Sequence, residues 1–118
     1  MRERDLDDRL LRFGARTLRL AGALPRTAAG RHIAGQLLRC ATSIGANYQE
    51  AQAAESRGDF IHKLQVALKE ARETNYWLRL IEAARLLPAA KLAGLLDESA
   101  QLKAILAKSV ASAKGISK

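Results

Sequence analysis

The sequence predicts an all-α fold, an antiparallel up-down-up-down four-helix bundle that occupies residues 1–118 as a single domain. Three observations predict it. The apolar residues are mostly Leu and Ala, and the chain has only 8 Gly and 2 Pro, which favours helix over sheet. Apolar residues recur every three or four positions, the period of one helix face. Turn signals near positions 25, 58 and 88 divide this pattern into four segments and argue against one continuous coiled coil.

The first two helices are predicted over residues 5–24 and 27–55. The first ends before Pro25, because proline disfavours helical geometry in the residue that precedes it. Each has one apolar stripe whose spacings alternate between three and four. The first stripe is Leu6, Leu10, Phe13, Thr17, Leu20 and Leu24, and the second is Ile33, Leu37, Cys40, Ile44, Tyr48 and Ala51.

The third and fourth helices are predicted over residues 59–87 and 88–114. Residues 56–59 form a turn signal, in which Asp59 is a suitable N-cap for the third helix. Pro88 suits the first position of the fourth helix, and Gly115 follows its end. The third stripe is Phe60, Leu64, Ala67, Ala71, Thr74, Leu78 and Ile81, and the fourth is Leu92, Leu95, Leu96, Leu102, Leu106 and Val110.

The residues that commonly carry catalysis are not arranged for it. A di-iron bundle needs a Glu-x-x-His pattern on two helices, and neither His32 nor His62 has a glutamate three residues before it. The single cysteine, Cys40, lies on an apolar stripe, where a buried and inert thiol is expected. The glycine-containing stretch 43–47 matches no phosphate-binding loop. We therefore expect no enzyme activity, no catalytic residue, no cofactor and no metal site. Without a secretory signal or a membrane-length apolar run, a cytoplasmic location with no membrane contact is expected.

Several small or polar residues lie on or beside the apolar stripes. The small residues of the second helix are expected to let two helices approach closely; they are Ala41, Ser43, Gly45 and Ala46. The polar residues are Asn47, Glu50, Glu70, Glu73, Thr74 and Asn75. They have two interpretations. One is hydrogen bonding between helices together with pairing within a helix, and the other is a polar pocket or a network that fixes the helix register.

The most informative feature is the placement of charge. Lys and Arg number 20 against 12 Asp and Glu, which gives a net charge of +8. Residues 9–49 contain no acidic side chain and seven arginines, which are Arg9, Arg12, Arg16, Arg19, Arg26, Arg31 and Arg39. At about 100° per residue, the first four fall within roughly 80° of one another on one helix. Such a ridge can be a solvated face, but unrelieved like charges repel, and arginine suits phosphate recognition. The seven arginines are therefore candidate nucleic-acid contacts.

A second candidate surface is apolar. Some large apolar residues lie off the main stripes, and exposed apolar patches usually mark contacts between proteins. These are Leu11 and Leu18 on the first helix and Val66, Trp77 and Leu80 on the third. We expect them to form an oligomer interface, although a wide core stripe would explain some of them.

Two segments carry a family resemblance that extends over nearly the whole chain. They are QLLRCATSIGANYQEAQ (36–52) and DFIHKLQVALKEARETNYWLRLI (59–81). They resemble the signature stretches of the four-helix-bundle proteins named for intervening sequences in 23S ribosomal RNA genes. The resemblance implies an antiparallel bundle that assembles into a homopentamer, and it supplies no catalytic residue. A related branch consists of accessory proteins to the reverse transcriptases of diversity-generating retroelements.

The sequence thus predicts a non-enzymatic, oligomeric bundle protein that binds RNA or DNA through its arginine-rich surface. The alternative is a protein-binding adaptor or scaffold whose basic face docks a partner, for example a reverse transcriptase. Steep weakening of binding with salt would favour the first interpretation. Salt-insensitive binding to a protein, with no binding to free RNA, would favour the second.

Overall fold

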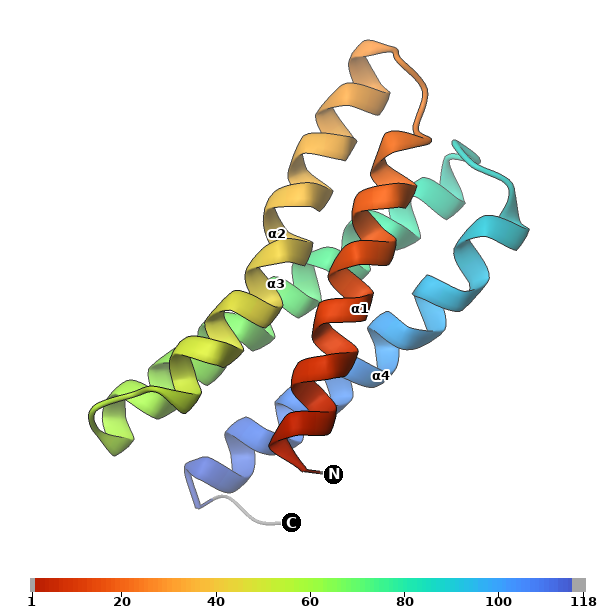
Figure 1. Cartoon of the computed structure of the whole chain (residues 1–118). Helices are drawn as coiled ribbons and strands as arrows, with labels where there is room; N and C mark the ends of the chain where they lie inside the picture. Colours follow the sequence, from red (N-terminus) through yellow and green to blue (C-terminus); the bar gives the residue numbers. More distant parts are fainter. Residues whose placement is uncertain (1, 116–118) are drawn as a thin grey trace.

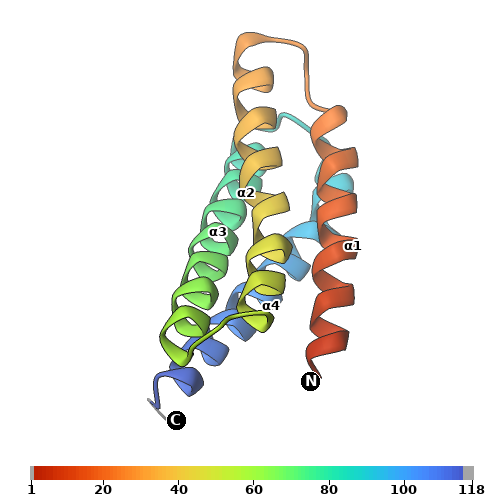
Figure 2. The same cartoon turned by 60° about the vertical axis from the view of Figure 1, so that its left-hand side comes forward.

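The structure, a computed structural model, describes residues 2–115. It has four helices in chain order: α1 (Glu3–Gly22), α2 (Ala28–Gln52), α3 (Arg57–Ala83) and α4 (Ala89–Ala113). Each helix packs against its neighbours in the sequence, and α4 also contacts α1, which closes the bundle (Figure 1). The start of α1 lies at the same end of the bundle as the end of α4, as four antiparallel helices require (Figure 2). The predicted all-α, up-and-down bundle is confirmed, and it is 44 Å long.

The predicted apolar stripes form the core with two exceptions. Every stripe residue of α1 and α2 is buried, and Phe13, Leu37 and Ile44 are at most 1% exposed. On α3 and α4, Phe60 and Leu96 are only partly buried. Residues outside the stripes are buried instead, namely Leu68, Asn75 and Ser99. The stripe of α3 is wider than predicted because this helix has the most extensive contacts of the four, on one side with α2 and on the other with α4.

The polar side chains in the core find hydrogen-bond acceptors close by. Thr17 and Thr74 each donate their hydroxyl to the carbonyl oxygen four residues earlier, at 2.8 Å. Asn75 of α3 donates its amide to Ser99 Oγ of α4 at 3.2 Å, and Lys103 of α4 donates to Asn75 Oδ1 at 3.4 Å. The predicted hydrogen bonding between helices is confirmed here, and it joins α3 to α4.

Side chains cap the N-termini of α2 and α3, and the predicted cap of α3 is wrong. Thr27 caps α2 by accepting the Gly30 N–H. For α3, the N-cap is Ser56 rather than Asp59, because Ser56 Oγ accepts the Asp59 N–H at 3.1 Å. Asp59 therefore lies inside the first helical turn, where its negative charge still favours the helix N-terminus.

The helix ends differ from the predicted ranges by up to four residues. The third helix ends at Ala83, not at residue 87, and Arg85 adopts a left-handed conformation with φ 55°. The Arg85 N–H donates to Glu82 O and the Leu86 N–H to Ile81 O, both at 3.1 Å. This pair of bonds is a Schellman motif, which usually requires glycine. The other ranges, 3–22, 28–52 and 89–113, each lie within three residues of the prediction at either end.

The α1–α2 connection depends on one close approach. A Cβ atom added to Gly30 would lie only 2.0 Å from the carbonyl oxygen of Pro25, so no larger residue fits without moving the turn. Farther along, a Cβ on Gly45 would meet Leu10 Cβ at 3.5 Å, an ordinary contact. The helices α1 and α2 pack together at Gly45, but a methyl group would fit there, so the close approach expected from the small residues does not depend on this glycine.

Candidate nucleic-acid interface

The arginine ridge of α1 faces α4, and its first member is held by a carboxylate. Arg9 donates from Nε to Glu98 Oε2 at 2.9 Å and from Nη2 to Glu98 Oε1 at 2.7 Å. It also donates to Gln101 Oε1 at 3.2 Å. The side chains of Arg9 and Glu98 are only 21% and 20% exposed. Arg9 is therefore a bridge between α1 and α4 rather than an open phosphate contact.

The pKa of Glu98 shows that the arginine ridge of α1 lies close to this carboxylate of α4. The hydrogen bond from Arg9 lowers the pKa of Glu98, while partial burial opposes this effect. The charges of Arg9, Arg16 and Arg12 lower this pKa further. Three arginines of the ridge therefore act on one α4 carboxylate, and a single negative charge offsets only part of the ridge.

The rest of the ridge is exposed, and two of its arginines, Arg16 and Arg19, line one side of a basic groove. Within residues 2–115, no ion pair is formed by Arg12, Arg16 or Arg19, and all three are exposed. Arg16 lies against α4, because a Cβ on Gly94 would be 2.8 Å from its Nη2. A groove of about 410 Å³ between α1 and α4 is lined by Arg16, Arg19, Leu20, Ala23, Lys91 and Leu95. Its charged lining is entirely positive.

Lys91 is a member of this groove that sequence reasoning missed. It belongs to α4 and is separated from Arg16 and Arg19 by more than 70 positions. The α1–α4 contact that closes the bundle brings it there. The predicted antiparallel topology could have indicated Lys91, because an antiparallel bundle places the start of α4 beside the end of α1.

The other predicted arginines lie outside the groove. Arg26 and Arg31 are exposed at the α1–α2 connection, where Arg31 donates to Arg26 O at 3.1 Å. Arg39 lies on α2 and pairs across the α2–α3 boundary with Glu70, at 3.4 Å, and with Glu73. The structure thus brings Arg12, Arg16 and Arg19 together and assigns Arg9 and Arg39 to ion pairs between helices.

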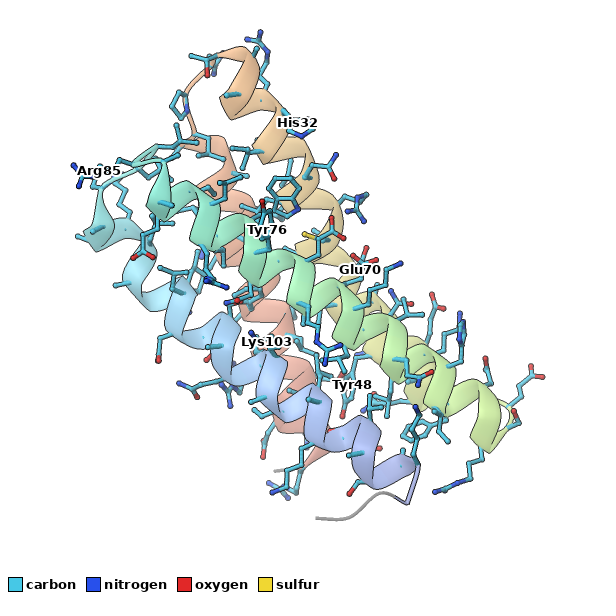
Figure 3. The ribbon with its side chains drawn as sticks, turned by 180° about the vertical axis from the view of Figure 1, so that it is seen from behind. His32, Tyr48, Glu70, Tyr76, Arg85 and Lys103 are labelled. Atoms are coloured by element: carbon cyan, nitrogen blue, oxygen red, sulfur yellow. The ribbon has the colours of Figure 1, made fainter. Side chains whose placement is uncertain are left out.

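The ion pairs of Arg39 with Glu70 and Glu73 lie beside a group of aromatic rings. Glu73 also accepts a hydrogen bond from Trp77 Nε1 at 3.2 Å. The Trp77 ring meets the rings of His32 and Tyr76 nearly edge-on, with centroid distances of 5.9 and 5.2 Å. Figure 3 views this side of the bundle, with His32 on α2 and Tyr76 on α3. Tyr76 and Trp77 are neighbours on α3, whereas His32 joins them only through the packing of α2 on α3.

The predicted oligomer residues fall on two helices that do not contact each other. Leu11 and Leu18 of α1 are 75% and 50% exposed. They border a largely apolar groove of about 460 Å³ between α1 and α2, in which Gly14, Ala15 and Ala46 are also present. Val66, Trp77 and Leu80 of α3 are half-buried. The α1–α2 groove is thus the more open of the two apolar surfaces.

The described part of the chain offers little for metal binding or nucleophilic chemistry. Residues 2–115 contain no group of three or more His, Cys, Asp or Glu side chains placed to hold a metal ion. Cys40 is fully buried as predicted, with its thiol 3.6 Å from Leu37 O. Burial raises the pKa of this thiol and keeps it protonated. No helix in residues 2–115 is both long and apolar enough to cross a lipid bilayer.

Comparisons with known proteins agree with the fold. The family described as 23S rRNA-intervening sequence protein matches residues 8–108. A crystal structure of a protein of unknown function from the S23 ribosomal protein family of Bacteroides thetaiotaomicron is 35% identical. The alignment covers 93% of this chain and 98% of that one, with a TM-score of 0.84. No curated protein matches the chain. This chain, with its four-helix bundle and its match over residues 8–108, belongs to the family of 23S rRNA-intervening sequence proteins.

Proposed function

We propose that this protein is a non-enzymatic, oligomeric bundle protein of the cytoplasm that binds RNA or DNA through the basic groove between α1 and α4. The observation that carries the proposal is the convergence of Arg16, Arg19 and Lys91 on one groove without a carboxylate in its lining. Arg12 extends the same surface. Helix-spaced cations contact phosphates and carry no base information, so binding is expected to tolerate sequence changes.

Self-association is part of the proposal and uses a different surface. Exposed leucines beside a groove of small residues are typical of helix packing between subunits. Leu11 and Leu18 beside the α1–α2 groove match this description. The family resemblance suggests a homopentamer, and light scattering of the purified chain measures its mass directly.

The test is a salt series with a matched pair of variants. Labelled RNA and DNA, single- and double-stranded, are titrated at several salt concentrations. The Arg16→Ala/Arg19→Ala variant loses two groove cations, and Lys108→Ala/Lys114→Ala loses two cations from the opposite end of α4. Loss of two phosphate contacts lowers the salt slope by about 1.4 on single strands and about 1.8 on duplex DNA.

The outcomes separate the alternatives. A lower slope in the groove variant, with the wild-type slope in the α4 variant, supports the groove. Equal slopes in both variants contradict it. Absence of binding at low salt contradicts nucleic-acid binding altogether and favours the protein-binding adaptor.

A further inference from the structure

A second cationic surface runs along the solvent side of α3. Lys69, Arg72, Tyr76 and Arg79 are all exposed, and at about 100° per residue they fall within roughly 80° of one another. Within residues 2–115, Lys69, Arg72 and Arg79 form no ion pair. These four residues, here called the α3 stripe, span about 15 Å along the helix.

Three acidic residues of α3 lie near this stripe; two of them are turned to another partner, and the third, Glu82, is exposed one turn beyond Arg79. Glu70 and Glu73 lie on the α2 side, where Arg39 pairs with both. Their side chains are only 13% and 29% exposed. Arg39 neutralises one of these two negative charges, and with Glu82 two negative charges remain near the stripe, so its three cations still leave it positive.

The aromatic residue in the middle of the stripe is both accessible and supported. Tyr76 is 54% exposed, and the edge contact with Trp77 holds its ring from one side. Trp77 is in turn fixed by its hydrogen bond to Glu73 and by its contact with His32. A ring held in this way loses little conformational entropy when a ligand stacks on it.

We propose that the α3 stripe binds single-stranded RNA or DNA, with one base stacked on Tyr76 and the neighbouring phosphates bound by Lys69, Arg72 and Arg79. Surfaces of this kind combine cations that follow the backbone with an aromatic ring for the bases. A duplex cannot use Tyr76 in this way, because its bases are already stacked inside the helix. A second copy of the chain is disfavoured, since the same unpaired cations would repel one another.

This inference rests on the proposed function for its class of partner but uses a different surface. The α1–α4 groove is expected to bind phosphates of both single and double strands. The α3 stripe adds a preference for single strands. A groove variant is therefore expected to lose affinity for both single and double strands, and a stripe variant for single strands only. Each proposal can thus be refuted without the other.

The experiment compares Tyr76→Ala and Tyr76→Phe with the wild type. The probes are a labelled oligouridine and an RNA duplex of equal length. Loss of one stacked base weakens oligouridine binding by about fivefold or more in Tyr76→Ala. Duplex binding stays within about twofold, and Tyr76→Phe binds like the wild type. Because Trp77 is the single tryptophan and contacts Tyr76, its fluorescence is expected to change when oligouridine binds.

Three results would overturn the inference. The first is wild-type oligouridine affinity in Tyr76→Ala, with a melting curve that shows an intact fold. The second is an equal loss for oligouridine and duplex. The third is a change in oligomer mass in Tyr76→Ala, which would make the stripe an interface between copies. If Arg16→Ala/Arg19→Ala binds normally while Tyr76→Ala loses oligouridine selectively, the groove proposal fails and the stripe remains.

Discussion

Replacement of Glu98 by glutamine is expected to weaken the fold and strengthen nucleic-acid binding at the same time. Glu98 accepts two of the three guanidinium hydrogen bonds of Arg9, at 2.7 and 2.9 Å, and joins α1 to α4. The Glu98→Gln change removes the only negative charge that pairs with the α1 ridge within residues 2–115. Arg9 then becomes available as an additional phosphate contact beside Arg12.

The size of the stability loss follows from the exposure of the pair. Exposed ion pairs contribute below about 1 kcal/mol, and breaking a buried pair costs about 3–5 kcal/mol. With side chains 20–21% exposed and a two-bond geometry, the Arg9–Glu98 pair lies between these limits. Because glutamine keeps one acceptor, we expect a loss of about 1–2 kcal/mol. For a chain of 118 residues this lowers Tm by about 4–8 °C.

Thermal unfolding and a salt series measure the two effects. Glu55→Gln is the matched control, because it removes one exposed negative charge at the α2–α3 turn, away from the ridge. The salt slope of Glu98→Gln should exceed that of the control by about 0.7 on single strands, the contribution of one phosphate contact. A Tm within 1 °C of the wild type, or a slope equal to that of Glu55→Gln, would refute the reasoning.

The same pair predicts a pH dependence. The folded-state pKa of Glu98 is lowered by Arg9, so the unfolded chain binds more protons in the acidic range. The stabilisation from this pair is therefore complete above the ordinary glutamate pKa, about 4.3, and is lost as pH falls through the lower folded-state pKa. Glu98→Gln should show a smaller loss of stability between neutral and acidic pH than the wild type.

Two further predictions concern the interior of α2. Gly35→Ala should raise Tm by about 4 °C, because a Cβ there meets nothing within 4 Å and alanine favours helix by about 1 kcal/mol. Gly30→Ala should lower Tm, because its Cβ would lie 2.0 Å from Pro25 O; equal shifts in the two variants would contradict this contrast. Cys40 should react with alkylating reagents far more slowly in the native protein at pH 8 than in denaturant, because it is buried and its pKa is raised. Equal labelling rates in both conditions would show that the thiol is accessible.

The core was predictable from the sequence because burial follows the helical period. Every predicted stripe residue of α1 and α2 is buried, from Leu6 to Ala51. The end of α3 was not predictable, since Arg85 takes a left-handed conformation without the glycine that signals it. The start of α3 was misassigned because Ser56 and Asp59 are both good caps, and the choice between them depends on the entry of the chain into the helix.

The candidate site was predictable only in part. Spacing alone placed the α1 arginines on one ridge, but it could not show which of them are paired. Arg9 meets a carboxylate 89 positions away, and Arg39 meets two across the α2–α3 boundary. The spacing of the α3 stripe was equally visible in the sequence. Its support was not, because His32 joins Trp77 only through the packing of α2 on α3.

The net charge of +8 therefore acts through its distribution rather than its sum. Three carboxylates form ion pairs with arginines of a neighbouring helix, and each is less than a third exposed. They are Glu98, Glu70 and Glu73. Among the exposed cations that form no ion pair within residues 2–115, one group lines the α1–α4 groove and another forms the α3 stripe, while others, such as Arg26 and Lys108, lie elsewhere. A bundle can in this way acquire polyanion-binding surfaces without a recognition motif, because the pairs that join its helices also decide which arginines remain open to phosphate. Substitutions of the paired carboxylates should thus alter binding as surely as substitutions of the open arginines, and with the opposite sign.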